Sequence, residues 1–408
     1  MRASGSVRSE IGNLPALDGL RGVAVLWVIA FHAFVLRKDL GDPWIDLAAS
    51  STWLGPVIGS GYLGVDLFFL LSGFLLALPW FVHAIRGQPP PSAREFYARR
   101  ARRILPAYYA QLVLLFAVVL PLLRGLDYWR SDLYVYVYNL VTHATFLHNT
   151  TPLSSGSMQV NGALWTLAVE AQFYLLVPLV APLVVRWPRP ALAVSFAIAI
   201  AWRLATHDGL GPLVAFEMAL GRPWGWTEDV VRYLLLHQLP SYCGHFVLGM
   251  VLGGACLTWR EGGHSRAARR ALDAGLALAL GLLYWTIAID GRIAGNLTWA
   301  IPALCLGFLL WRAAVGGGAG KALAIAPLAF AGRVSYSAYL LHLPLQFLWN
   351  RYAAALPPWL SLPLYLAAVL ALSWLSWRFI ERPFLRPKGA DSRPRVPLGN
   401  EMPLVDPR

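Results

Sequence analysis

Long apolar runs alternate with short polar or Pro/Gly-rich stretches along almost the whole chain. Ten runs are long enough to cross a bilayer as helices, since a span needs about 20 mainly apolar residues. Their approximate limits are 20–37, 61–85, 104–123, 163–185, 190–206, 231–259, 271–290, 297–312, 327–350 and 359–380. The pattern predicts an all-α polytopic integral membrane protein.

The segment 133–149 is rich in tyrosine and histidine, and hydropathy alone does not assign it. When it is left out of the span count, the arginine clusters at 86–103 and 260–270 share the side of the membrane that holds the amino terminus. Counting it as a span would move 260–270 to the other side, although cationic loops tend to stay in the cytoplasm. We therefore predict about ten transmembrane helices, both termini in the cytoplasm, and a short re-entrant or interfacial element at 133–149 on the outer face.

The same pattern predicts one membrane domain in the cytoplasmic membrane. We expect residues 1–19 to form a cytoplasmic amino-terminal segment, 20–386 the transmembrane domain and 387–408 a disordered cytoplasmic tail. The net charge of +13 does not indicate a nucleic-acid partner, because the arginines lie in loops between spans. The three cysteines lie in apolar runs without metal-ligand spacing, so no metal site is expected.

Two ionisable residues in the first span lie on one face of the predicted helix. Arg21 and His32 are eleven positions apart, close to three full turns, and a rise of about 1.5 Å per residue separates them by roughly 16 Å. An arginine near the water edge suits a phosphate, and a deeper histidine suits acid–base chemistry. The pair predicts a site for one extended anionic molecule, with a hydrogen-bonded packing role as the alternative for His32.

Three further titratable residues fall in the outer half of the predicted membrane, at depths similar to His32. Asp66, Glu170 and His342 lie about 8–10 Å from the outer ends of their spans by the helical rise. Ionisable side chains within spans are costly and tend to mark function. Asp66 could instead cap its helix, and His342 could be a packing residue.

Six segments occur in order over nearly the whole chain: LDGLRGVAVLWVIAFH at 17–32, GVDLFFLLSGFLLA at 64–77, FYARRARRILPAYY at 96–109, ALWTLAVEAQFYLLVPL at 163–179, GRVSYSAYLLHLPL at 332–345 and SWRFIERPFLR at 376–386. Together they resemble the membrane-bound acyltransferase family 3. The resemblance implies an O-acyltransferase with about ten spans. It would move an acyl group, commonly acetyl, from coenzyme A to a hydroxyl of a sugar in a surface glycan, peptidoglycan, a lipid-linked glycan or a glycosylated natural product.

The resemblance also assigns roles to individual positions. The family's first-helix arginine and histidine fall on Arg21 and His32, and its arginine pair before the third span falls on Arg99 and Arg102, with Arg100 and Arg103 as a second register. Its other motif residues fall on Trp165, Glu170, Ser335, Tyr336 and His342. Ala171 stands where many relatives carry a second acidic residue, which puts a carboxylate pair there in doubt.

We therefore expect acyl-CoA, usually acetyl-CoA, as the donor and a sugar or glycan as the acceptor. The expected donor-binding residues are Arg21, Arg99, Arg102 and Arg103. His32 would accept the proton of the sugar hydroxyl, with Asp66 or Glu170 orienting its imidazole. A transporter or flippase of a lipid-linked glycan is the alternative, disfavoured because no paired repeats are evident.

Overall fold

The protein is described by a computed structural model that covers residues 15–38, 40–125, 133–150, 161–221, 227–261, 265–290, 299–353 and 355–385. Within these ranges the regular structure is entirely helical. The longer helices are α2 (Pro15–Arg37), α5 (Leu63–Ile85), α6 (Ala93–Leu114), α11 (Trp165–Arg186), α12 (Pro188–Asp208), α15 (Leu239–Glu261), α16 (Arg266–Asp290), α17 (Ala300–Ala314), α20 (Ser335–Tyr352) and α21 (Pro358–Ser376). The shorter elements are α3 (Pro43–Ser50), α4 (Leu54–Gly59), η1 (Leu115–Val119), α7 (Leu120–Arg124), α9 (Leu133–Ala144), η2 (Gly162–Leu164), α13 (Gly211–Gly221), α14 (Glu228–Leu236), α18 (Gly318–Leu323), α19 (Ala326–Arg333), η4 (Trp377–Glu381) and α22 (Arg382–Leu385).

Eight helical stretches of the described chain are long and apolar enough to cross a membrane. They are Pro15–Arg37, Leu63–Ile85, Ala93–Arg124, Gly162–Arg186, Pro188–His207, Glu228–Trp259, Arg266–Ala288 and Trp359–Leu385. Of the other two predicted spans, 297–312 corresponds to the 15-residue helix α17, and 327–350 is divided into α19 and α20 at Val334. The prediction of an all-α polytopic membrane protein is confirmed, while the total of ten spans and their orientation stay predictions.

The first helix begins earlier than predicted. Helix α2 begins at Pro15, inside the segment expected to precede the first span, because proline is well suited to the first turn of a helix. The rest of that segment, residues 1–14, and the predicted tail at 387–408 lie outside the described residues.

The ambiguous segment 133–149 contains only the 12-residue helix α9. At about 1.5 Å per residue this helix is too short to cross a hydrocarbon core of about 30 Å. It is tied to α6 by two phenol groups: Tyr108 donates to the carbonyl of His143 at 2.8 Å, and Tyr109 donates to that of Ala144 at 2.9 Å. Its exclusion from the spans agrees with its length, and its place at the outer membrane face stays a prediction.

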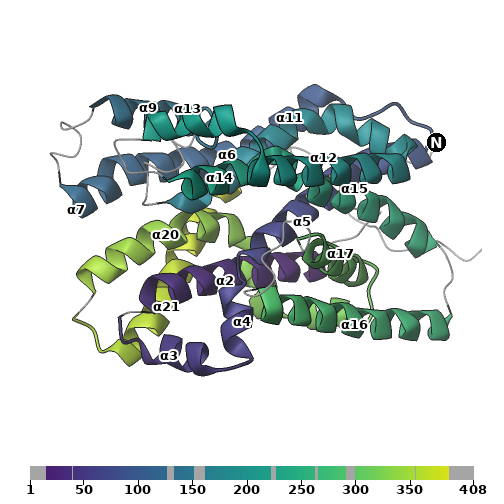
Figure 1. The fold of residues 1–408 in the computed structure, drawn as a ribbon. Helices are drawn as coiled ribbons and strands as arrows, with labels where there is room; N and C mark the ends of the chain where they lie inside the picture. The colour runs from purple at the N-terminus through teal and green to yellow at the C-terminus, as the bar shows by residue number, and fades with distance from the viewer. Residues whose placement is uncertain are drawn as a thin grey trace, which may run out of the picture.

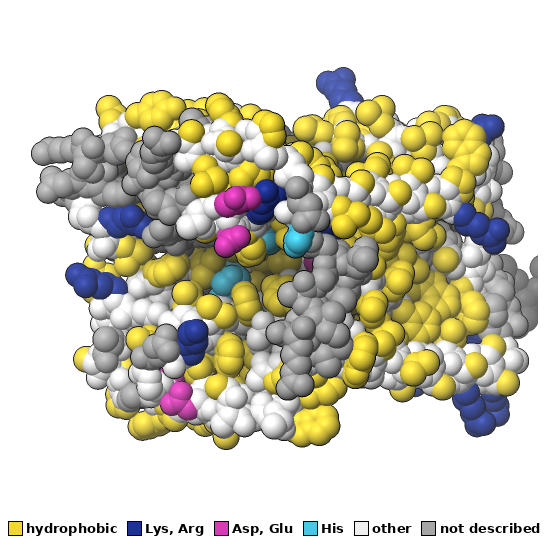
Figure 2. Space-filling view, viewed as in Figure 1, with side chains coloured by type: hydrophobic (Ala, Val, Ile, Leu, Met, Phe, Trp, Pro, Cys, Tyr) yellow, Lys and Arg dark blue, Asp and Glu magenta, His cyan; other side chains and the backbone are white. Residues whose placement is uncertain are grey.

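The outward faces of several spans carry large apolar side chains. Val113, Leu179 and Leu278 are 67%, 69% and 75% exposed. In Figure 2, hydrophobic side chains cover much of the surface between the two ends of the molecule, and several basic side chains lie toward those ends. Such exposure is unfavourable in water and expected of surfaces in contact with lipid.

Helix α5 lies in the middle of the molecule (Figure 1) and contacts α2, α11, α15 and α17. Glycines allow its closest crossing, with α15. A Cβ at Gly73 would lie 2.0 Å from the carbonyl oxygen of Phe246, and one at Gly249 would lie 2.1 Å from that of Leu70. Small residues at such crossings let two helix backbones approach closely inside a membrane. The central position of α5 brings Asp66 and Ser72 into the interior.

Candidate active site

Two neighbouring cavities contain most of the predicted site residues. The arginine cavity, of about 90 Å³, is lined by α2, α5, α6, α11 and α20 side chains that include Arg21, Ser72, Arg100, Arg103, Glu170, Tyr174, Ser335 and Tyr336. The histidine cavity, of about 850 Å³, is lined by side chains that include His32, Asp66, Trp165, Arg203, His237 and Tyr242. Val65 and Tyr339 line both cavities, so the two lie side by side at these residues.

The arginine cavity concentrates positive charge. Arg21 comes from α2, and Arg100 and Arg103 come from α6, where their spacing of three residues puts them on one face. None of these three guanidinium groups makes a side-chain hydrogen bond or ion pair with a residue that the structure describes, and the Nε atom of Arg100 is buried without a partner. Guanidinium N–H groups that have no protein hydrogen-bond partner and surround one cavity are suited to bind phosphate.

Glu170 is the only acidic residue among the described side chains that line the arginine cavity. The hydroxyl of Ser72 donates to Oε1 of Glu170, and the Tyr174 hydroxyl donates to the same oxygen at 2.5 Å. These two bonds hold the carboxylate toward α5 and its own helix. Glu170 therefore lies beside the arginines, and the predicted contact with the imidazole of His32 is not found.

Arg99 and Arg102 do not line the cavity. Arg99 is exposed and pairs with Glu95 at 3.3 Å, and the Nε of Arg102 donates to the carbonyl of Ala98 at 3.1 Å. The buried face of α6 carries Phe96, and residues four and seven positions further along share that face, which selects 100 and 103. Of the four arginines expected to bind the donor, Arg21 and Arg103 line the cavity together with Arg100, and Arg99 and Arg102 do not.

The histidines predicted to lie at one depth meet directly. Nε2 of His342 lies 3.2 Å from Nδ1 of His32, and Nδ1 of His342 lies 2.8 Å from the carbonyl oxygen of Tyr339. A carbonyl only accepts, so His342 carries its proton on Nδ1 and its Nε2 is an acceptor. Nδ1 of His32 is then the donor, shared with the carbonyl of Val28 at 2.9 Å. This pattern leaves Nε2 of His32 without a proton and ready to act as a base.

His342 is fully buried behind His32, which itself lines the histidine cavity. Asp66 lines the same cavity, but its nearest ionisable partner is His245, whose Nε2 lies 3.6 Å from Oδ2 of Asp66. The group that orients His32 in this structure is therefore another imidazole. Neither of the two carboxylates proposed from the sequence has that position.

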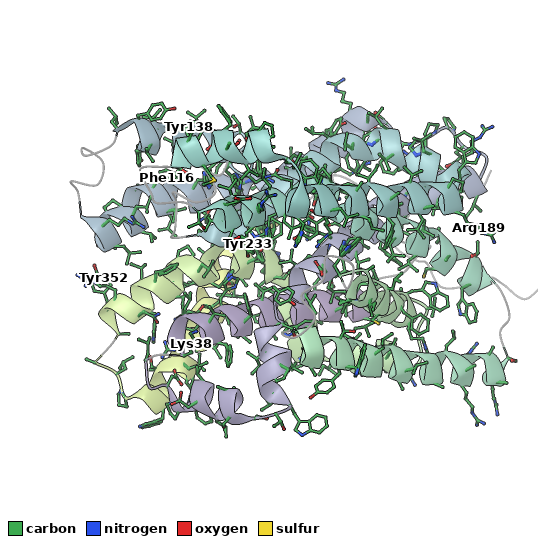
Figure 3. The ribbon with its side chains drawn as sticks, viewed as in Figure 1. Lys38, Phe116, Tyr138, Arg189, Tyr233 and Tyr352 are labelled. Atoms are coloured by element: carbon green, nitrogen blue, oxygen red, sulfur yellow. The ribbon has the colours of Figure 1, made fainter. Side chains whose placement is uncertain are left out.

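The remaining predicted residues divide between the cavities. Ser335 and Tyr336 line the arginine cavity, and the Tyr336 hydroxyl donates to the carbonyl of Ile104 at 3.0 Å. Trp165 lines the histidine cavity, where its ring meets that of His237 edge-on at 4.5 Å. Figure 2 shows a hollow in the visible face in which histidine side chains lie near acidic and basic ones, and Tyr233, which lines the histidine cavity, lies in the same part of the molecule (Figure 3).

Sequence reasoning missed one charged residue of the histidine cavity. Arg203 lies inside the predicted span 190–206, and an arginine within a span is itself a functional signal. Its neighbours His237 and His245 also lie within a predicted span, 231–259. Among the described residues, no group of three or more His, Cys, Asp or Glu side chains has the arrangement of a metal site.

The fold and its two cavities define a multi-pass membrane protein with a cavity lined by three arginines beside a hydrogen-bonded pair of histidines. A family model described as an acyltransferase domain matches residues 14–378. The chain belongs to this acyltransferase family, which confirms the resemblance of its six segments.

Several curated relatives are similar to the chain. The O-acetyltransferase OatA of Staphylococcus aureus is 26% identical over 391 residues, which cover 92% of this chain and 58% of the relative. The peptidoglycan O-acetyltransferase OatA of Listeria monocytogenes is 30% identical over 219 residues, 51% of this chain and 29% of the relative. Nodulation protein 10 of Rhizobium leguminosarum is 28% identical over 270 residues, 63% and 69% of the two chains. The chain thus spans just over half the length of the staphylococcal relative, and no solved structure matches it.

Proposed function

We propose that this chain is a membrane O-acyltransferase that moves an acyl group, acetyl in the first instance, from acyl-CoA to a hydroxyl of a sugar. The observation that carries the proposal is that the two cavities lie side by side and share Val65 and Tyr339 as lining residues. The arginine cavity has three arginines whose N–H groups lack a partner among the described residues, and the histidine cavity has His32 with an unprotonated ring nitrogen. The named activities of the O-acetyltransferase relatives support the same reaction class.

Donor binding follows from the arginine cavity. Arg21, Arg100 and Arg103 would hold the phosphates of coenzyme A, because planar guanidinium groups bind phosphate oxygens in pairs. The pantetheine arm would then pass Val65 and Tyr339 toward His32. The separation of Arg21 and His32 along α2, roughly 16 Å, sets the length that the arm has to cover. With the amino terminus in the cytoplasm of a cell, the donor enters from the cytoplasmic side of the cytoplasmic membrane.

Transfer follows from the tautomer of His32. Its Nε2 accepts the proton of the acceptor hydroxyl while that oxygen attacks the thioester carbonyl. The C–S bond then breaks, and the coenzyme A thiolate takes the proton back from the imidazolium. His342 accepts the hydrogen bond from Nδ1 of His32 throughout and so keeps Nε2 directed into the cavity. General-base catalysis of this kind typically contributes about 10²- to 10⁴-fold.

The test is acyl transfer by the purified protein in lipid nanodiscs with labelled acetyl-CoA. His32→Ala should abolish transfer while donor binding stays within about twofold of wild type. His83→Ala is the matched control, since that imidazole is near the end of α5, contacts the carbonyl of Pro89 at 2.6 Å and lines neither cavity. Full activity of His32→Ala would overturn the mechanism. A transporter would leave the thioester intact in every sample.

A further inference from the structure

Arg203 of α12 is a buried cation to which neither the sequence motifs nor the mechanism assigns a role. It is 9% exposed and lines the histidine cavity. Its guanidinium lies over the ring of Trp299 at 4.6 Å and near that of Tyr242 at 5.7 Å. These stacking contacts fix the orientation of the guanidinium and leave its N–H groups available for hydrogen bonds.

The cavity supplies no partner for this charge among the residues that the structure describes. The side chain of Arg203 makes no hydrogen bond or ion pair with them, and its Nε is buried without an acceptor. Asp66 is the only acidic side chain among the described residues that line the cavity, and its contact is with His245 at 3.6 Å. A buried arginine without a partner is costly, and the cost is recovered when an oxyanion binds.

The same cavity contains the base of the proposed reaction. His32 lines it together with Arg203, so an acceptor whose hydroxyl reaches Nε2 of His32 also lies within the space that Arg203 faces. Arg203 is the only arginine or lysine among the described residues that line the cavity. The guanidinium is therefore the main charged feature that an acceptor meets on this wall.

We propose that Arg203 binds an oxyanion, a carboxylate or a phosphate, carried by the acceptor sugar, and that the protein selects acidic acceptors. The proposal rests on the proposed acyltransferase function. It identifies the acceptor as a sugar with a negatively charged substituent as well as a free hydroxyl. Asp66, on the same cavity, is placed to accept hydrogen bonds from the uncharged hydroxyls.

The experiment compares acceptors with purified full-length protein in nanodiscs and labelled acetyl-CoA. The three acceptors are octyl β-D-glucuronide, glucose 6-phosphate and octyl β-D-glucoside. Wild type should prefer one of the charged acceptors over the neutral one by about tenfold in kcat/KM, since a charge-assisted hydrogen bond is worth about that factor. The charged acceptor with the higher kcat/KM shows whether the site prefers a carboxylate or a phosphate.

The variants then test the residue. Arg203→Gln should remove the preference and leave the neutral acceptor within about twofold, and Arg203→Lys should retain part of it because the charge stays but the planar fork is lost. Arg189→Gln is the matched control on the same helix, since Arg189 is exposed and lies at the far end of the molecule from Lys38 and Tyr352 (Figure 3). Equal use of all acceptors by wild type, or an equal loss for all acceptors in Arg203→Gln, would overturn the proposal.

A binding measurement separates this proposal from the proposed reaction. Thermal stabilisation of the protein by glucuronate, compared with glucose, needs no acetyl-CoA. If wild type consumes no acetyl-CoA but glucuronate stabilises it more than it stabilises Arg203→Gln, the anion site stands and the acyltransferase proposal fails. If acetyl-CoA is consumed and neither acceptor preference nor stabilisation depends on Arg203, the reaction stands and the anion site fails.

Discussion

The arginine cavity and the histidine cavity differ in the charged and titratable side chains that line them. Among the residues that the structure describes, the arginine cavity is lined by three guanidinium groups and one carboxylate, whose hydrogen bonds are made to hydroxyls. The described lining of the histidine cavity has one arginine, one aspartate and several imidazoles, and the imidazole of His32 is hydrogen-bonded to the buried His342 behind it. Cationic groups and imidazoles are thus separated along α2, with Arg21 lining one cavity and His32 the other.

The largest effect is expected when the two arginine pairs of α6 are replaced by glutamine in turn. The double variant Arg100→Gln/Arg103→Gln should raise the KM for acetyl-CoA by at least about 100-fold, because each lost charge-assisted contact costs about 1.5–3 kcal/mol. Arg99→Gln/Arg102→Gln should stay within about threefold of wild type, since both side chains are outside the cavity. Steady-state kinetics at varied acetyl-CoA checks both. A larger effect for the second pair would contradict the assigned face of α6.

His342 tests whether one imidazole positions the other. His342→Ala should lower kcat by about 10- to 100-fold, since it removes the acceptor of the Nδ1 proton of His32. The KM for acetyl-CoA should change by less than about threefold, because His342 does not line the arginine cavity. His342→Gln, whose amide oxygen can accept the same bond, should recover part of the rate. A purely structural role would lower protein stability without this difference between the two variants.

Glu170 gives the smallest expected effect and the clearest contrast with the sequence prediction. If its carboxylate only balances the arginines, Glu170→Gln should lower the KM for acetyl-CoA by about 3- to 10-fold, because one negative charge leaves the cavity that binds the phosphates. The kcat should change little. Equilibrium binding of coenzyme A alone measures the same effect without turnover. A large fall in kcat would contradict this expectation and indicate that Glu170 takes part in catalysis.

Most of the helices were predictable because apolar length is a direct property of the sequence. Some predicted spans differ from the helices that the structure describes. Helix α17 has only 15 residues, and the run 327–350 is interrupted at Val334 between α19 and α20. Ser335 and His342, which both fall in the predicted span 327–350, lie on one helix, since α20 begins at Ser335.

The site was predictable only in part. Arg21 and His32 line the two adjoining cavities as their spacing along α2 indicated, and Glu170 lies inside the molecule. The carboxylates were expected at His32 because depth in the membrane was the only coordinate available from the sequence. Depth puts groups in one layer, but it does not say which of them touch.

The sequence by itself determined the number and rough limits of most helices, the common face of Arg21 and His32, and the family. Only the tertiary structure decided that Arg100 and Arg103 face inward, that His342 contacts His32 and that Arg203 stacks on Trp299. The physical reason is that lipid and protein interior are both apolar, so the hydrophobic pattern of a span does not specify its rotation about its own axis. That rotation is set by close packing between helices, as at Gly73 and Gly249 of α5 and α15.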